Sequence, residues 1–115
     1  MIAGGAAAVS LFGQAALAHA FLDHASPAVG SEISGSPPTL SLTYSEPVEP
    51  LFSTIRVTGA GGARVDQGKP VPQQDGRVLQ IGLKPLSPGV YSVEWHITSV
   101  DTHKTDGHFS FTVKP

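Results

Sequence analysis

Apolar and polar residues alternate with a period of two in five stretches of the chain. In an extended strand successive side chains point to opposite faces, so each stretch predicts a half-buried β-strand. Prolines, glycines and serines separate the stretches, and no segment keeps the 3.6-residue period of an amphipathic helix. The pattern therefore predicts an all-β sandwich or Greek-key barrel. The five stretches are Thr39–Tyr44, Thr54–Thr58, Arg77–Ile81, Val90–Thr98 and His108–Val113.

The predicted core is aromatic at its centre. Tyr91 and Trp95 share the apolar face of the longest stretch, and Phe109 and Phe111 share that of the last one. Large rings on the inner faces of two strands bury the most surface per residue. We therefore expect these four side chains to pack together.

Two segments rich in glycine or proline predict turns and loops. Gly59–Gly62 has the composition of a hairpin tip. The segment from Asp66 to Gly76 contains two prolines, and we expect an irregular loop that crosses between strands.

The first 18 residues differ from the rest, because every Lys, Arg, Asp and Glu lies after residue 18. An apolar run that ends in the small-x-small triplet Ala16–Ala18 predicts a cleaved signal peptide over residues 1–18 and a mature domain over 19–115. The run is short and glycine-rich, so we expect no stable membrane insertion, and export would place the protein in the periplasm or outside the cell. A second triplet, Ala18–Ala20, would place the cut two residues later and remove His19.

Composition removes several classes of function. The 115 residues carry a net charge of −2 without a block of Lys or Arg, so nucleic-acid binding has no electrostatic support. The chain has no cysteine, and its one methionine is Met1. Disulfides, thiolate metal sites and the sulfur ligands that Cu(I) prefers are therefore excluded from the mature domain.

Of the five histidines, three have an ordinary structural explanation. His96 lies on the polar face of the longest stretch, and we expect it to be solvated. His108 is also predicted at the surface, and its closeness to His103 in sequence makes it a minor metal-ligand candidate. His24 shares the parity of Leu22, so we expect it to pack partly inward and count it as a second minor candidate.

His103 follows Asp101 by two residues in a polar loop between two strong strand predictions. Residues two apart in an extended segment point the same way, so a carboxylate and an imidazole converge. Oxygen and imidazole nitrogen together suit a hard-to-borderline metal ion. The tripeptide alone is a weak signal, because most such tripeptides are ordinary turns.

Cleavage after Ala18 would give His19 a free α-amine, whose pKa is roughly 8. The amine nitrogen and the ring Nδ1 of one N-terminal histidine form a chelate. With the His103 imidazole and an Asp101 oxygen they complete a nitrogen and oxygen set, which favours tetragonal Cu(II). A structural zinc site would more often use cysteine or four closed ligands.

Three segments of the chain resemble the CopC-type periplasmic copper-binding proteins: HAFLDHASPAVGS, LSLTYSEPVEP and YSVEWHITSVDTHKTDGHFSFTV. The resemblance implies a seven-stranded Greek-key fold and a Cu(II) site at His19, Asp101 and His103. It also implies that Glu46 lies beside the copper as a ligand or hydrogen-bonding group. Some members have a methionine-rich Cu(I) loop and a second N-terminal histidine; this chain has no such loop, and Phe21 stands at that position.

The resemblance implies a Cu(II)-binding protein for copper homeostasis or resistance, which carries or buffers the ion and is not an enzyme. It further implies a monomer that works beside an inner-membrane protein of the CopD type. Two alternatives remain open. One is an oxidase similar to copper mono-oxygenases, which uses the same histidine brace. The other is a metal-free, immunoglobulin-like interaction module, which needs only the β pattern.

Overall fold

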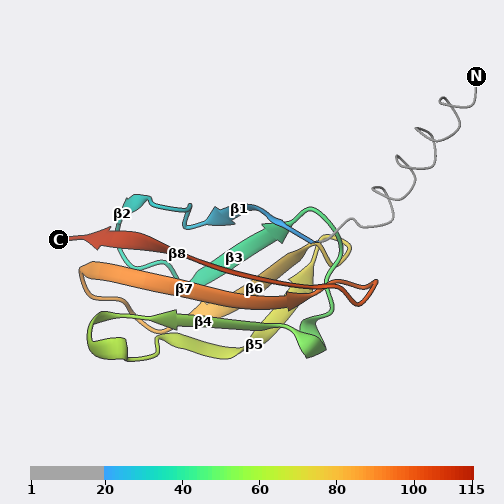
Figure 1. The fold of residues 1–115 in the computed structure, drawn as a ribbon. Helices are drawn as coiled ribbons and strands as arrows, with labels where there is room; N and C mark the ends of the chain where they lie inside the picture. Colours follow the sequence, from blue (N-terminus) through green and yellow to red (C-terminus); the bar gives the residue numbers. More distant parts are fainter. Residues whose placement is uncertain (1–19) are drawn as a thin grey trace, which may run out of the picture.

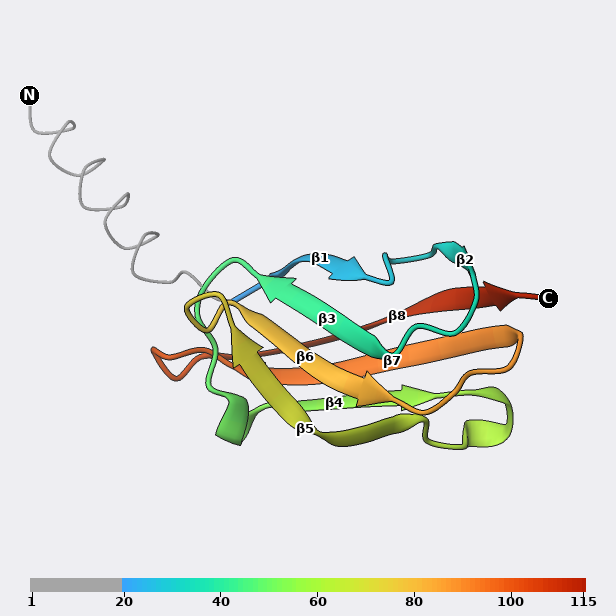
Figure 2. The ribbon, with the colours of Figure 1, turned by 180° about the vertical axis from the view of Figure 1, so that it is seen from behind.

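Two four-stranded sheets stack face to face in the computed structural model, which describes residues 20–115 (Figures 1 and 2). The predicted signal peptide and His19 lie outside the described residues. The first sheet has the order β1 (Leu22–Ser26), β3 (Thr39–Tyr44), β6 (Val78–Leu83), β5 (Asp66–Gln73). The second has the order β2 (Glu32–Ser34), β8 (Lys104–Lys114), β7 (Gly89–Thr98), β4 (Thr54–Thr58). Two short 3-10 turns are η1 (Pro50–Phe52) and η2 (Ala60–Gly62).

The predicted all-β sandwich and its aromatic core are confirmed. Tyr91 and Phe111 stack with ring centroids 5.7 Å apart, and Tyr44 meets Trp95 edge to face at 5.4 Å. All four side chains are buried, as is Phe109. The alternating positions of β3, β6, β7 and β8 supply most of the remaining core: Leu40, Leu42, Leu79, Ile81, Leu83, Val93, Ile97 and Val113.

The prediction of an irregular loop from Asp66 to Gly76 is wrong, because Asp66–Gln73 forms β5. This strand lies at the edge of its sheet, and among residues 20–115 its one partner strand is β6. An edge strand accepts proline, because one row of its N–H groups has no ladder partner. Pro70 lies within a break in the β5–β6 register, between Gln67 and Val71, and Pro72 is opposite Leu79 in the register that follows the break.

Two other strands extend the sequence prediction. β8 begins at Lys104 rather than His108. Its first four residues, Lys104 to Gly107, are mostly polar, but each is paired with a residue of β7. Glu32–Ser34 forms a three-residue strand parallel to the end of β8. Residues 20–115 therefore form eight strands where the resemblance implied seven.

His24 does not pack inward as predicted. Its side chain is 68% exposed, with Nδ1 3.5 Å from Oδ2 of Asp23. The β1–β3 register shifts between Leu22 and His24, and this irregularity places Ala25 in the core instead. An extra residue in one strand reverses the parity of everything after it, which alternation alone cannot predict.

The carboxylate of Asp66 links two edge strands that belong to different sheets. β4 and β5 are edge strands of opposite sheets, and η2 connects them. Asp66 on β5 accepts the Val57 N–H of β4 at 2.8 Å through Oδ1. Arg64 donates from Nε to Oδ1 at 3.2 Å and from Nη2 to Oδ2 at 2.7 Å. The hydrogen bond from Val57 to Asp66 therefore links the edge of one sheet to the edge of the other, and Arg64 pairs with the carboxylate that accepts it.

Candidate metal-binding site

A tight loop over residues 99–103 joins the two longest strands. The Ser99 N–H donates to the His103 carbonyl at 2.9 Å, and the Thr102 N–H donates to the Ser99 carbonyl at 2.9 Å. Thr102 has a left-handed φ of 74°, which is uncommon outside glycine and turns the chain sharply. The loop therefore returns the chain to β8 with little freedom in its backbone.

Asp101 and His103 face each other within this loop, as predicted, although a tight turn through Thr102 rather than an extended segment brings them together. His103 Nδ1 lies 3.3 Å from Asp101 Oδ2, and the two side chains are 38% and 52% exposed respectively. The buried Ser99 hydroxyl donates to Asp101 Oδ1 and accepts the His103 N–H at 3.2 Å. Sequence reasoning missed Ser99, because a loop serine carries no signal that distinguishes a buried organising hydroxyl from a solvated one.

The surroundings of Asp101 favour its charged form. The hydrogen bond from Ser99 lowers the pKa of the Asp101 carboxyl, partial desolvation opposes this, and the neighbouring His103 lowers it further. The carboxylate is therefore an anion at neutral pH, and half of its surface is open to solvent. Such a group can accept a cation without first losing a proton.

The first described residues are held against the start of β8, next to this loop. The buried Ala20 offers its carbonyl to Thr105 Oγ1 at 2.8 Å. Phe21 and Ser45 exchange two hydrogen bonds of 2.9 Å, from the Phe21 N–H to the Ser45 hydroxyl and from the Ser45 N–H to the Phe21 carbonyl. Figure 1 shows the start of β1 and the 99–103 loop at the same end of the sandwich.

Glu46 belongs to the same end of the molecule. It is exposed, and it lies between Ser45, which pairs with Phe21, and Pro47, whose carbonyl accepts the Val100 N–H at 3.1 Å. The short segment that contains Glu46 is thus fixed on one side to the first described residues and on the other to the 99–103 loop. The sequence alone suggested only a strand-end surface residue.

The other candidate histidines lie elsewhere. His96 and His108 are exposed on the outer face of the second sheet, and His24 is exposed on β1. Within residues 20–115, no three His, Asp or Glu side chains already converge as a metal cluster. The structure thus brings Asp101 and His103 together, while His19 lies outside the described residues and its role stays a prediction.

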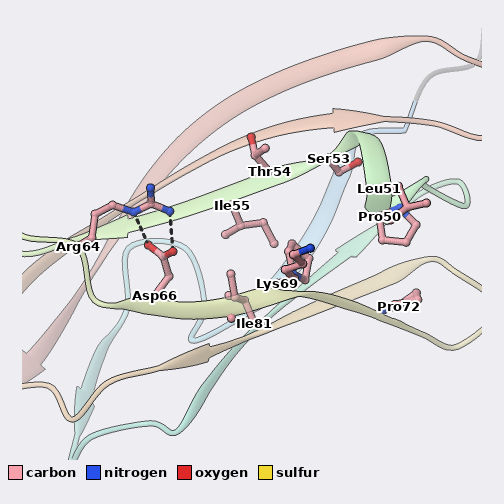
Figure 3. A pocket seen from close by; sticks show the side chains of 12 residues that line it. Pro50, Leu51, Ser53, Thr54, Ile55, Arg64, Asp66, Lys69, Pro72 and Ile81 are labelled. Atoms are coloured by element: carbon pink, nitrogen blue, oxygen red, sulfur yellow. Dashed lines mark hydrogen bonds and ion pairs between the residues drawn. The ribbon is translucent and has the colours of Figure 1, made fainter.

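A separate groove of about 440 Å³ runs between β4, β5 and η1 (Figure 3). Leu51 borders it at the η1 end, and the Arg64–Asp66 pair borders it at the other. Neither Asp101 nor His103 lines this groove. In the part of the chain that the structure describes, no helix is long and apolar enough to cross a membrane.

Comparison with known proteins identifies relatives over most of the chain. The CopC domain family model matches residues 22–114. Protein YobA of Escherichia coli strain K12 is 40% identical over 102 residues, which cover 84% of this chain and 80% of YobA. The crystal structure of CopC from Methylosinus trichosporium OB3b has a TM-score of 0.78 and 33% identity, covering 84% of this chain and 95% of that one. PcoC, described as a methionine-rich copper resistance protein from Escherichia coli, has a TM-score of 0.75 and 32% identity, covering 84% and 100%.

Proposed function

Because the chain belongs to the CopC family, we propose that it binds Cu(II) outside the cytoplasm and carries or buffers the ion. The proposed ligands are His19, through its free α-amine and imidazole, together with Asp101 and His103. Glu46 is a further ligand or a hydrogen-bonding neighbour of the ion. The donor set is nitrogen and oxygen without sulfur, which suits Cu(II) rather than Cu(I).

One observation supports this proposal: the residue that follows His19 in the chain is held beside the loop that contains Asp101 and His103. Ala20 is bonded to His19 in the chain, and its carbonyl accepts a hydrogen bond from Thr105, two residues after His103. The Asp101 carboxylate and the His103 imidazole meet beside this point at 3.3 Å. Consecutive Cα atoms are about 3.8 Å apart, so a ligand at residue 19 needs no long reach.

Removal of the signal peptide would then create the site. An internal residue 19 has an amide nitrogen, which cannot act as a neutral amine donor. The amine released by cleavage sheds its proton to a metal near neutral pH and completes a chelate with the ring of the same residue. We infer that the protein is periplasmic and passes copper to or from an inner-membrane CopD-type protein.

Binding is favoured over oxidation chemistry by the position of the tyrosine and tryptophan rings. Tyr91 and Trp95 are buried, as the alternation predicts, so neither forms an exposed platform for a polymeric substrate; the exposed rings among residues 20–115 are those of Phe21 and Phe52. A redox assay separates the two functions. With ascorbate and oxygen, the copper-loaded protein should give no sustained peroxide or sugar oxidation, and steady turnover would contradict the carrier function.

The critical experiment compares the protein that begins at His19 with the same protein carrying one extra residue before it. Because the extension converts the amine into an amide and breaks the chelate, we expect Cu(II) affinity to fall about 100-fold or more, or about 2.7 kcal/mol. Competition titration against a chelator of known affinity measures this change.

A matched control makes the result specific. His24→Gln removes an exposed histidine near the same terminus and should leave Cu(II) affinity unchanged. Equal affinity with and without the extension would refute a role for the α-amine. Failure of the native protein to bind one tight equivalent would favour a metal-free interaction module.

A further inference from the structure

A second group of potential metal ligands lies on the outer face of the β2–β8–β7–β4 sheet. On β7, Glu94 and His96 lie on either side of the buried Trp95 in sequence, and on β8 Asp106 and His108 are likewise two residues apart. Because alternate residues of a strand share a face, all four exposed side chains point to the same solvent side. We call these four residues the outer-face cluster.

The β7–β8 register turns the outer-face cluster into two neighbouring cross-strand pairs. Glu94 is opposite His108, and His96 is opposite Asp106, within an uninterrupted antiparallel ladder of ten residue pairs. Opposed Cβ atoms in such a ladder are about 4.5–5.5 Å apart and diagonal neighbours about 7–8 Å apart. The two imidazoles therefore occupy one diagonal of a small square and the two carboxylates the other, at spacings that a single ion can bridge.

These side chains have room to rearrange. His96 and Glu94 are 59% and 55% exposed, and His96 Nε2 lies 3.8 Å from Glu94 Oε2. Both border a hollow of about 200 Å³ on the side of β4. No three ligating side chains converge already among the described residues, so binding requires new rotamers on a fixed backbone rather than movement of the sheet.

Basic side chains flank the outer-face cluster, and Arg56 and Arg64 border the same hollow as Glu94 and His96. Arg56 is opposite Glu94 on β4, and Lys104 is the next outward residue before Asp106 on β8. Within residues 20–115, neither of these cations lies within ion-pair distance of the two carboxylates. Two carboxylates and two imidazoles thus share one patch of surface, and this donor set matches borderline divalent ions.

We propose that Glu94, His96, Asp106 and His108 form a second binding site for a borderline divalent transition-metal ion. The site is separate from the 99–103 loop, since Asp106 follows His103 by three strand residues, roughly 10 Å along the chain. Because its ligands sit on the middle of the β7–β8 ladder, the site does not need the free N-terminus. Ordering four exposed side chains costs conformational entropy, so the ion binds here more weakly than at a preformed chelate.

The test uses the full chain of residues 1–115, in which residue 19 has no free α-amine, with Asp101→Asn and His103→Gln, which removes the loop ligands. Cu(II) alone is the probe, titrated in the presence of excess glycine, and bound copper is counted by electron paramagnetic resonance. We expect this variant to retain one equivalent of Cu(II). Adding either His96→Gln or His108→Gln should weaken that binding at least tenfold, because both imidazoles hold the same ion.

His24→Gln in the same background is the matched control. His24 is an exposed histidine 3.5 Å from a carboxylate, as His96 is, but it pairs with Thr43 across its ladder. Its removal should change nothing. Absence of a bound equivalent in the starting variant would overturn the proposal, as would independent, equal losses from His24, His96 and His108. Neither outcome bears on the proposed loop site, which the N-terminal extension tests.

Discussion

Two aspartates in this protein share a sequence arrangement and differ in their surroundings. Asp66 follows Arg64 by two residues, and Asp101 precedes His103 by two residues. Each carboxylate faces its basic neighbour, at 2.7 Å from Arg64 Nη2 and at 3.3 Å from His103 Nδ1. The Asp66 side chain is 5% exposed, whereas that of Asp101 is 52% exposed.

The difference in surroundings separates a structural carboxylate from one suited to binding. Both oxygens of Asp66 accept hydrogen bonds from protein donors, one from the Val57 N–H and Arg64 together and one from Arg64 alone. Asp101 accepts the Ser99 hydroxyl and faces His103, and half of its surface remains open to solvent. An ionised carboxylate has about four acceptor positions, so an open one can still take a cation.

Of the changes that test the difference between the two aspartates, removal of the structural carboxylate of Asp66 should have the largest effect. Asp66→Ala leaves the Val57 N–H without its acceptor and Arg64 without its counter-ion at the joint between the two sheets. We expect the free energy of unfolding to fall by about 3 kcal/mol. Urea denaturation followed through Trp95 fluorescence measures it.

The control for this variant is Asp23→Ala, which removes a carboxylate that is 63% exposed beside His24. It should change stability by less than about 0.5 kcal/mol. Folded Asp66→Ala should bind Cu(II) with native affinity. A clear loss of affinity would show that the two aspartates do not act independently.

For Asp101 we expect the opposite result, a loss of copper affinity with little loss of stability. Asp101→Asn keeps the shape of the side chain and removes its charge, so we expect Cu(II) affinity to fall about tenfold to a hundredfold, or about 1.4–2.7 kcal/mol. Because the side chain is half exposed, the free energy of unfolding should change by less than about 1 kcal/mol. Competition titration and urea denaturation of the same preparation test both halves. If Asp101→Asn were destabilised and kept native copper affinity, Asp101 would be a structural carboxylate and not a copper ligand.

Sequence alternation predicted the parts of the fold in which every second residue is buried. Thr39–Tyr44 and Thr54–Thr58 match their strands at both ends for this reason. Asp66–Gln73 has no such alternation, because it lies at a sheet edge with most of its side chains exposed. Its place depends on pairing with a strand that follows it in the chain, which no local pattern of residues encodes.

In the candidate site, too, some features were predicted from the sequence and others depend on the fold. The two-residue spacing of Asp101 and His103 predicted that they converge, and the structure brings them to 3.3 Å. The buried hydroxyl of Ser99 and the closeness of Glu46 to the loop depend on contacts between distant segments. Closeness in sequence therefore predicted that these two side chains meet, but the turn through Thr102 that brings them together and the groups that surround them depend on the fold. The role of His19 stays a prediction.

The smallest expected effect is the change in folding stability when the pH is lowered. Burial alone would raise the pKa of Asp66, but hydrogen bonds from Arg64 and the Val57 N–H, together with the Arg64 charge, hold it below its ordinary value of 3.8. The folded state therefore favours the ionised carboxylate, and this contribution to stability is fully present above the ordinary value and is lost as pH falls through the lowered one.

Asp66→Asn has no carboxyl group to titrate at this position. We expect its urea midpoint to lie below that of the native protein, and this difference in midpoint should become smaller as the pH is lowered from about 6 to about 3. Other carboxyl groups titrate alike in both proteins and cancel in the difference. The pKa of Asp101 is also lowered, first by the Ser99 hydrogen bond, but its half-exposed carboxylate is screened by solvent. Asp101→Asn should accordingly show a smaller narrowing over the same range. An equal or larger narrowing for Asp101→Asn would mean that exposure does not separate the two carboxylates, and that Asp101 also stabilises the fold.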